Sequence, residues 1–253
     1  GNYRWVPDFS ELIERIKKKY AETGQKVTVA CDSETMGLNP YDPNAEIVCF
    51  GFTDRPGYAD LVYTGPNYEP VKTQIDMPLY EQVQWLLTTD MIKMVFANGK
   101  YDVNWFFLKW GIECLNFTFD TSLVGNLLDE ERSNSLSNHS KTLTDMGGYD
   151  WEMEKYDKGH MENVPPDVQL RYAGGDIDAT YRVGSILRDQ LLEDPKLTKF
   201  YVTILHPACR AFEKIERRGM LVDPEKFHKL NAELTKEIAN LIETGLEILP
   251  NKL

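Results

Sequence analysis

Three short apolar runs follow one another in the first quarter of the chain, and turn-forming residues separate them. Residues 26–32, 47–53 and 60–64 are rich in Val, Ile, Phe and Tyr, while Gly, Pro and Asn gather between them. β-Branched and aromatic residues suit strands, and glycine, proline and asparagine suit the turns that join them. The pattern predicts three strands arranged as an antiparallel meander.

Helical spacing dominates the rest of the chain. The first helix is predicted at residues 8–20, where one stripe carries the apolar side chains of Phe9, Leu12, Ile13 and Ile16. Residues 93–97 are predicted to form a strand. Further helices are predicted at residues 79–88, 101–110, 121–129, within 135–147 and at 166–193. Strands that are grouped first, followed by one strand among helices, indicate an α/β fold with three layers.

A second, helical part of the chain begins near Pro195. Residues 200–218 have a helical pattern, and a turn with a short extended piece follows. Pro224 then suits the first position of another helix, which we expect to run towards Leu249 and to stop at Pro250. The sequence thus predicts two domains, 1–194 and 195–253.

Composition limits the classes of protein that this chain can belong to. Its 253 residues are 42% hydrophobic and 11% aromatic, which is typical of a globular protein and not of a disordered one. The sequence has no apolar stretch near 18 residues and no charged-then-apolar leader, so we expect neither a membrane span nor a signal peptide. Its cysteines lack a CxxC pair and favour reduced thiols in a cytosolic protein over disulfides or zinc. They are Cys31, Cys49, Cys114 and Cys209.

Two carboxylates stand two residues apart where the first apolar run ends, in the segment CDSET at 31–35. Because side chains alternate along a strand, Asp32 and Glu34 project from one face. Like charges at this spacing repel each other unless a cation lies between them, and Mg²⁺ and Mn²⁺ prefer oxygen ligands. The pair by itself fits either a metal site at the end of a strand or an acidic turn.

More acidic side chains follow in two later segments. The strand predicted at 93–97 leads into Asn98 and then Asp102, and the helix predicted at 166–193 carries Tyr172 and Asp176. A spacing of four residues puts Tyr172 and Asp176 on one helix face. Two-metal phosphoryl-transfer sites use carboxylates to hold two cations about 3.5–4 Å apart, which clamp the attacking and leaving oxygens. Four carboxylates and a phenol from three segments match that requirement.

These three segments carry a resemblance to a known family. DSETMGL at 32–38, NGKYD at 98–102 and YAGGD at 172–176 are similar, in order and rough spacing, to the three exonuclease motifs of the DEDD superfamily. A tyrosine four residues before the last aspartate resembles the DEDDy branch, whereas the DEDDh branch has a histidine where this chain has Arg171. With FDT at 119–121 and LLDE at 127–130, residues 25–189 resemble the proofreading domain of family A DNA polymerases, the bacterial polymerase I type.

The resemblance implies a ribonuclease H-like fold, in which a mixed sheet has helices on both faces and a helical C-terminal extension follows. Residues 212–223 resemble the segment where family A polymerases enter their polymerase domain, and the chain then ends at Leu253 without the polymerase motifs. We therefore expect a fragment of a longer polymerase, or a polypeptide whose partner carries the rest. A stand-alone exonuclease is the alternative.

The resemblance also implies a role for each motif residue. Asp32 would bridge two divalent ions, Mg²⁺ or Mn²⁺, and Glu34 and Asp176 would complete the site of the first ion. Asp102 would hold the second ion, through water, because Mg²⁺ gives up its hydration reluctantly. Tyr172, helped by Glu34, would orient the attacking water, since a phenol with a reference pKa of about 10 suits positioning better than proton abstraction.

Substrate contacts are expected from three residues. Leu38 resembles the position that wedges against the terminal base, Asn98 resembles a residue near the terminal nucleotide, and Thr35 is a candidate contact to the terminal sugar. Met36 and Phe106 would add apolar surface, although ordinary packing is the favoured reading for both.

Gly174 and Gly175 are unusual inside a helix, where each glycine costs about 1 kcal/mol relative to alanine. They fit either a close approach of metal, water or substrate, or else a tolerated local weakness or tight packing of the helix against a strand. Asp178 lies two residues beyond Asp176, on the opposite side of the helix, so we leave it out of the metal set. Asp120 is expected to support the structure.

A net charge of −12 argues against a stand-alone binder of long duplex, because neutralising phosphates calls for Lys and Arg. A domain that holds a few nucleotides at a strand end needs less, since its divalent ions and base stacking supply part of the attraction. The charge is compatible with a domain that receives its substrate from a partner or an attached domain.

Three functions stay open at this stage. The first is a 3′–5′ exonuclease that acts on single-stranded DNA 3′ ends as the proofreading domain of a polymerase, in cis or with a partner. The second is a DEDDy ribonuclease resembling ribonuclease D, and the third is a silent scaffold domain. The scaffold is disfavoured because Asp32, Glu34, Asp102 and Asp176 are all present. We expect a monomer without membrane contact, in the cytoplasm of a bacterium or of a phage-infected host.

Overall fold

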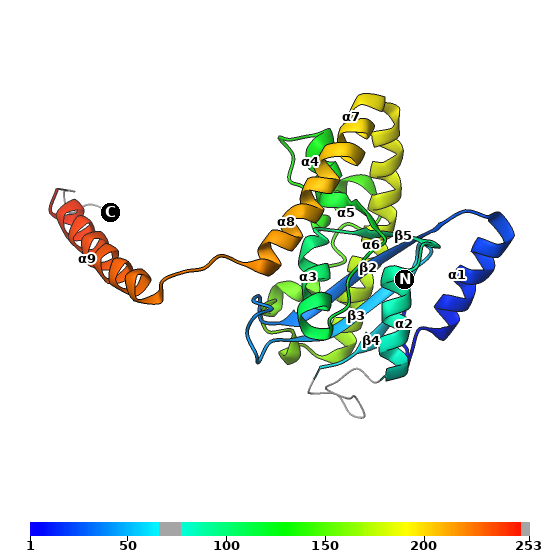
Figure 1. Cartoon of the computed structure of the whole chain (residues 1–253), viewed down its shortest axis with the longest axis horizontal. Coiled ribbons are helices and arrows are strands. Elements are labelled where there is room, and N and C mark those ends of the chain that lie inside the picture. The colour runs from blue at the N-terminus through cyan, green and yellow to red at the C-terminus, as the bar shows by residue number, and fades with distance from the viewer. Residues whose placement is uncertain (66–76, 249–253) are drawn as a thin grey trace. The chain divides into compact units, whose positions relative to one another are not determined.

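The structure is a computed structural model that describes residues 1–65 and 77–248, and it divides into two compact units (Figure 1). The first unit is Gly1–Arg217 and the second is Arg218–Leu253. All three segments that carry the predicted site lie in the first unit, so its architecture decides whether they meet.

A six-stranded mixed sheet forms the centre of the first unit, with the strand order β1-β4-β3-β2-β5-β6. In chain order the strands are β1 (Asn2–Trp5), β2 (Val27–Met36), β3 (Glu46–Thr53), β4 (Tyr58–Tyr63), β5 (Ile92–Phe96) and β6 (Phe117–Asp120). Strands β2, β3 and β4 pair antiparallel, which confirms the predicted meander. β5 pairs parallel with β2, β6 parallel with β5, and β1 parallel with β4.

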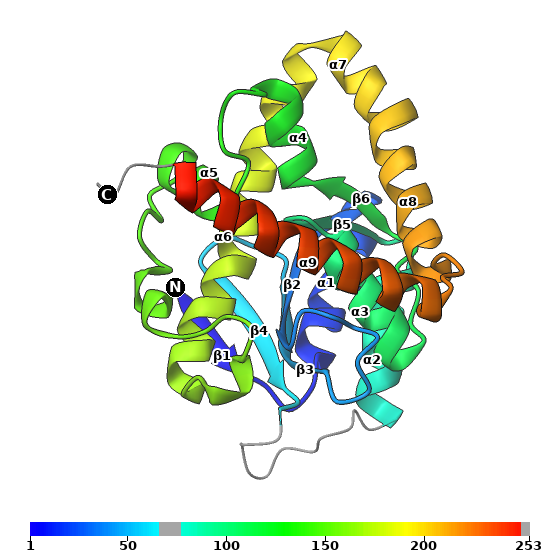
Figure 2. The same cartoon turned by 90° about the vertical axis from the view of Figure 1, so that its left-hand side faces the viewer.

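Helices cover both faces of the sheet, and Figure 2 shows α6 on one side and α2 and α3 on the other. On one face, α1 (Ser10–Thr23), α2 (Met77–Thr88) and α3 (Lys100–Trp110) close a core that includes Phe50. On the other face, α6 (Pro166–Glu193), α4 (Thr121–Leu128) and α5 (Leu136–Leu143) close a core that includes Leu61 and Ile177. The predicted three-layer arrangement is confirmed.

Two strands and one boundary differ from the sequence pattern. β2 continues to Met36, past the predicted end at Asp32, and stays paired with β3 up to Glu46. Asp32 and Glu34 therefore lie inside a paired strand and not after it, which corrects the expected strand end. β1 and β6 are strands of four residues that the pattern does not predict, because so short a run carries little periodicity.

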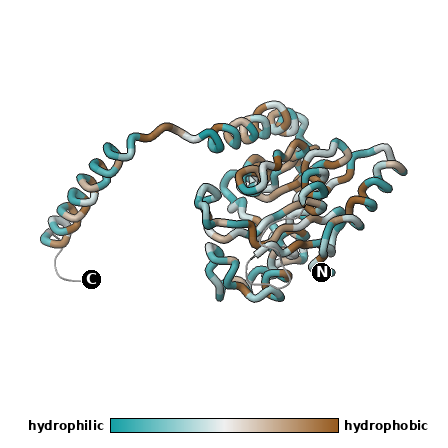
Figure 3. Tube along the Cα trace, turned by 60° about the horizontal axis from the view of Figure 1, so that its bottom comes forward, coloured by the Kyte–Doolittle hydropathy of each residue, from teal (hydrophilic) through white to brown (hydrophobic). Residues whose placement is uncertain are grey.

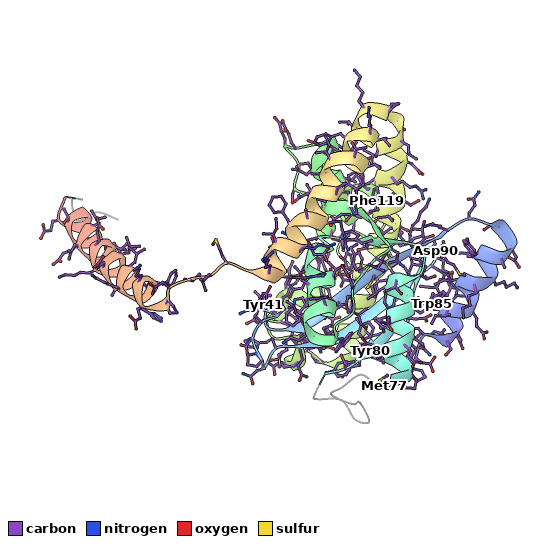
Figure 4. The ribbon with its side chains drawn as sticks, viewed as in Figure 1. Tyr41, Met77, Tyr80, Trp85, Asp90 and Phe119 are labelled. Atoms are coloured by element: carbon purple, nitrogen blue, oxygen red, sulfur yellow. The ribbon has the colours of Figure 1, made fainter. Side chains whose placement is uncertain are left out.

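The helical region after α6 belongs to the first unit as far as Arg217, and it confirms the helix predicted at 200–218, with a π-helical turn within it. Its parts are α7 (Pro195–Phe200), η3 (Tyr201–Leu205) and α8 (His206–Arg218). The buried Tyr201 accepts a hydrogen bond from the backbone amide of Asp120, 2.9 Å away. Tyr41, labelled in Figure 4, donates its hydroxyl to the Glu216 carbonyl oxygen of α8 at 2.8 Å. The division of the chain at residue 195 stays a prediction.

The second unit contains α9 (Pro224–Ile248), which begins at the predicted proline. Apolar and polar residues alternate along its coils, as the brown and teal bands of Figure 3 show. The predicted helix end at Leu249 and Pro250 lies outside the described residues. Within residues 1–65 and 77–248, none of the helices combines the length and the apolar character that crossing a bilayer requires.

Candidate active site

Strand β2 and helix α6 bring together the three carboxylates of the first predicted ion site. Asp32 and Glu34 share one face of β2, and both are partly exposed, whereas Asp176 of α6 is only 8% exposed. One carboxylate oxygen from each of the three lies within 4.8 Å of the others. Such a set of hard oxygen donors, open to solvent on one side, fits a divalent cation. We call Asp32, Glu34 and Asp176 the metal set.

Gly51 of β3 allows α6 to lie this close to the sheet. It is the register partner of Asp32 in β2. A Cβ atom at Gly51 would lie 2.9 Å from Cδ1 of Ile177 and 2.5 Å from the Asp60 carbonyl oxygen. Since Ile177 directly follows Asp176, the bare backbone at Gly51 gives the helix room to present Asp176 to β2.

Asp102 reaches the site from the first turn of α3, where it is 3% exposed. Its Oδ1 accepts hydrogen bonds from the Ser33 backbone amide at 3.0 Å and from the Ser33 hydroxyl at 2.6 Å. Ser33 lies between Asp32 and Glu34, so the carboxylate of Asp102 is fixed directly to the first motif. Asp102 is not part of the metal set, whose oxygens meet without it.

Burial sets the electrostatics of all four carboxylates. It raises the pKa of Asp102 to about 7 and that of Asp176 to about 6. Burial also raises the pKa of Asp32 and of Glu34 well above the ordinary range, and repulsion from the neighbouring carboxylates adds to it. The folded protein therefore holds these groups in a place where a proton, or a cation, is needed to balance their charge.

Tyr172 lies one helical turn before Asp176 on α6, as the spacing predicts. Burial and the charge of Asp176 raise the pKa of the phenol above its ordinary value, so Tyr172 stays protonated at neutral pH. Its Oη accepts a hydrogen bond from Nζ of Lys158 at 3.0 Å. The phenol is thus held in place beside the metal set with its own proton intact.

The site contains two further residues, Tyr149 and Lys158, that the sequence pattern does not predict. Tyr149 donates its hydroxyl to Oδ1 of Asp176. Lys158 precedes η2 (Met161–Asn163), in the irregular segment that follows η1 (Trp151–Lys155). Both residues come from stretches without helical or strand periodicity, and the sequence offers no motif that would single them out.

The glycine pair of α6 is explained by aromatic packing. A Cβ atom at Gly175 would lie 2.5 Å from the ring of Tyr149, and one at Gly174 would lie 2.5 Å from the ring of Tyr3. Of the two readings left open by the sequence, tight packing is therefore the correct one. The packing at Gly175 serves the site, because the same Tyr149 ring carries the hydroxyl that binds Asp176.

The remaining acidic residues near the motifs support the backbone. Asp178 accepts hydrogen bonds from Tyr3, from the Gly57 amide and from Arg182, so it faces away from the metal set. Asp120 caps the start of α4. It also accepts from the backbone amides of residues 98 and 99, which fixes the turn that leads into α3.

The three predicted substrate contacts have different environments. Leu38 is 71% exposed, just beyond the end of β2. The buried hydroxyl of Thr35 donates to the Gly37 carbonyl oxygen at 2.9 Å and lies 2.7 Å from the Tyr101 hydroxyl. Asn98 adopts a positive φ of 60°, a conformation that asparagine tolerates better than most residues.

Of the two residues for which packing was the favoured reading, Phe106 is fully buried. Its ring contacts those of Phe50 and Trp110 in the core between the sheet and α3. Met36, at the end of β2, is partly buried against the core on the α6 side.

Comparison with known proteins assigns this arrangement to a class. Residues 3–192 match a family described as 3′-5′ exonuclease. The DNA polymerase of Escherichia phage T5 is 27% identical over 261 residues, which cover 94% of this chain and 28% of that protein. The chain spans 24–28% of the length of the curated relatives that it matches.

Solved structures share the fold at low sequence identity. Brucella melitensis NrnC superposes with a TM-score of 0.58 at 20% identity, over 84% of this chain and 90% of that one. Escherichia coli RNase D, titled an exoribonuclease involved in structured RNA processing, gives a TM-score of 0.57 at 14% identity, over 87% of this chain and 52% of that one. These neighbours confirm the predicted ribonuclease H-like fold.

The fold and the matched sequence define a nuclease domain of the kind attached to DNA polymerases. The chain belongs to the 3′-5′ exonuclease family of family A DNA polymerases. Exonucleases of this family need divalent metal ions, and the oxygens of the metal set fit that need because their charge is poorly balanced by the protein alone.

Proposed function

We propose that this domain removes nucleotides from the 3′ ends of single-stranded DNA, as the proofreading part of a polymerase carried in cis. The observation that carries the proposal is the meeting of Asp32, Glu34 and Asp176 within 4.8 Å, with Tyr172 one turn away on the same helix as Asp176. The tyrosine supports assignment to the DEDDy type. DNA is favoured over RNA because the matched relatives are DNA polymerases.

The chain's carboxylates would hold two divalent ions, Mg²⁺ or Mn²⁺. Asp32, Glu34 and Asp176 would bind the first, and Asp102, with Asp32 shared between the two, would bind the second through water. When bound, the ions supply the charge that activates a water molecule and stabilises the leaving 3′ oxygen. The proposal matches the donor set, which consists of oxygen atoms alone.

The protein's own groups would orient the reactants. Tyr172 and Glu34 would flank the attacking water, one as a phenol and one as a carboxylate. Leu38 is exposed and free to pack against the terminal base. Asn98 would lie near the terminal nucleotide, and the Thr35 hydroxyl, which already donates to Gly37, keeps a lone pair for the terminal sugar.

A polymerase domain in cis would deliver the substrate. The chain covers about a quarter of its relatives, which leaves room for such a domain in the whole protein. The net charge of −12 also supports delivery, since a domain with this balance is poorly suited to capturing DNA alone. Because the relatives are bacterial and phage proteins, we place the protein in a bacterial or phage-infected cell.

The test is an incubation of 5′-labelled single-stranded DNA, and separately of RNA, with the protein and Mg²⁺ or Mn²⁺. We expect a ladder of DNA products shortened from the 3′ end, absent from the variant Asp32→Ala/Glu34→Ala. Cleavage of RNA alone would support a ribonuclease, in line with the fold shared with RNase D. Intact DNA and RNA with every metal would contradict the proposal and favour a scaffold.

A further inference from the structure

Lys158 brings a positive charge close to the carboxylates of the metal set. Its Nζ donates to the Tyr172 Oη at 3.0 Å and also lies over the Tyr172 ring, 4.7 Å from its centroid. Burial raises the pKa of each member of the metal set, and the charge of Lys158 opposes that shift at all three. The charge of the lysine therefore acts on the whole set, while its hydrogen bond goes to the tyrosine.

The backbone around Lys158 is fixed to the first motif. The Gly37 amide donates to the Gly159 carbonyl oxygen at 3.0 Å, and His160 forms an isolated bridge with Met36. On the other side of the lysine, the Asp157 carboxylate accepts from the Gly159 amide at 2.8 Å. The backbone that carries the Lys158 side chain is therefore held at the end of β2, at Met36 and Gly37, which follow Glu34 closely in the chain.

We propose that Lys158 is a positioning residue that sets the direction in which the Tyr172 hydroxyl donates its proton. This inference rests on the proposed function. An ammonium group has donors and no acceptor, so Tyr172 must accept from Lys158 through a lone pair. The single phenolic proton then points to another acceptor, and in the ion-free protein Asp176 is within its reach, since a hydrogen bond from Tyr172 lowers the pKa of that carboxyl. Where Asp176 holds an ion, the oxygen of the attacking water would be the acceptor that the reaction supplies.

Glu34 completes this arrangement. As a carboxylate it only accepts hydrogen bonds, so the water donates a proton towards Glu34 while it accepts one from Tyr172. Without Lys158, the phenol oxygen loses the donor that fixes it, and the water loses a fixed orientation. The lysine thus acts through Tyr172 and needs no contact with the reacting phosphate.

A double-mutant cycle tests the inference on the whole chain. The variants are Lys158→Ala, Tyr172→Phe and the two combined, with Lys155→Ala as a control, because Lys155 is an exposed lysine of the same segment. We expect Lys158→Ala to lower kcat about ten- to a hundredfold while KM for a DNA oligonucleotide stays within about twofold. In the Tyr172→Phe background, which keeps the ring but removes Oη, the same change should add little. Lys158→Arg, which keeps a charged donor, should restore most of kcat.

Three outcomes overturn the inference. Multiplicative losses in the double variant would show that Lys158 acts independently of Tyr172, and a change confined to KM would make it a phosphate contact. A loss of the thermal shift that Mn²⁺ gives the wild type would make it a structural support. The wild-type assay separates the two proposals: inactivity there contradicts the proposed function itself, whereas an active wild type with an additive cycle contradicts only the role of Lys158.

Discussion

Asp176 accepts a hydrogen bond from Tyr149 and faces Asp32 and Glu34 across the metal set. It carries one negative charge among several, in a place that water reaches poorly. Burial raises its pKa to about 6, and the ordinary value is 3.8. In the metal-free protein this group adds nothing unfavourable below about pH 4, and its cost to folding develops as the pH rises through 6. The repulsion between these carboxylates therefore lowers the stability of the metal-free protein, and the same negative charge allows the site to bind cations.

Removing the charge of Asp176 should therefore change both the stability of the metal-free protein and the stabilisation by metal. We expect Asp176→Asn to raise the free energy of unfolding of the metal-free protein at about pH 8, by up to about 3 kcal/mol for a shift of roughly two pKa units. The same variant should lose most of the stabilisation that Mn²⁺ gives the wild type, because binding to the folded state alone is what stabilises it. Urea denaturation with EDTA and with Mn²⁺ measures both effects.

The matched control is Asp178→Asn on the same helix. Asp178 is 1% exposed and pairs with Arg182 at 2.8 Å, so its neutralisation should lower stability, by about 1–3 kcal/mol. Mn²⁺ should still stabilise this variant as it does the wild type. A metal-free Asp176→Asn protein that is less stable than the wild type would contradict the view that the metal set is repulsive.

The motif residues could be predicted from the sequence because their spacing reports strand and helix faces directly. Asp32 and Glu34 share a face through the period of a strand, and Tyr172 and Asp176 through the period of a helix. Tyr149 and Lys158 approach the same point from irregular segments, where no period links position to direction. A glycine in a helix indicates that another group lies close to it, but the sequence does not identify Tyr149 as the group that lies close to Gly175.

At the scale of elements, the pattern predicts both ends of α6 and the presence of β2, but not the last four residues of β2 or the two short strands. The burial of one helix stripe or one strand face needs several apolar residues in register, so long elements leave a clear pattern. β1 and β6 have four residues each and are held by their neighbours in the sheet. The extra length of β2 does not show in the apolar pattern because Ser33, Glu34 and Thr35, which precede its last residue, are polar.

Helix α8 contacts α3 next to Asp102 through an ionic cluster of Glu213, Arg210 and Arg217. Glu213 is fully buried and pairs with Arg217 and, at 2.5 Å, with Arg210. Arg217 in turn donates to the Asn104 side chain at 2.7 Å and to the Val103 carbonyl oxygen at 3.1 Å. The last helix of the first unit therefore holds the turn of α3 that carries a proposed metal ligand.

Breaking this cluster should be costly. We expect Glu213→Ala to lower the free energy of unfolding by about 3–5 kcal/mol, because it leaves the partly buried Arg210 and Arg217 without their partner. The control is Glu216→Ala on the same helix, whose exposed pair with Lys100 should contribute about 0–1 kcal/mol. Urea denaturation of both variants at neutral pH measures the difference. Equal, small effects would show that α8 is loosely attached.

At the scale of the whole molecule, the helices from α7 to α8 pack as part of the first unit although they follow the predicted domain end at residue 194. Phe117 of β6 contacts the ring of His206 at 4.9 Å and the guanidinium of Arg210 at 5.3 Å. Phe119 contacts the ring of Tyr201 at 5.6 Å. Sequence resemblance marks where a related domain begins, whereas packing marks what must be present for folding, and the two need not coincide.

Truncated chains test whether the boundary given by sequence resemblance, residue 194, is also the boundary of the part that folds. We expect a fragment of residues 1–218 to unfold cooperatively and to resist proteolysis, like the whole chain. A fragment of residues 1–194 exposes Phe117 and Phe119 and should unfold at a temperature several degrees lower, since a loss of 1 kcal/mol lowers the midpoint by about 2–4 °C in a domain of this size. Equal stability of the two fragments would place the folding boundary at residue 194.

The negative charge of the molecule makes a prediction about how it meets DNA. For single strands, log K falls with log[salt] with a slope of about −0.7 for each phosphate neutralised. The catalytically impaired Asp32→Ala/Glu34→Ala variant lacks two of the carboxylates of a chain whose net charge is −12, so it stays strongly acidic at −10. Holding few nucleotides, it should bind a labelled single strand weakly, with a slope no steeper than about −2. Fluorescence anisotropy across a salt series measures this slope.

A slope of about −4 or steeper would reveal a basic track that captures DNA without help. A shallow slope means instead that affinity must come from whatever presents the strand end, which is the role we propose for an attached polymerase domain.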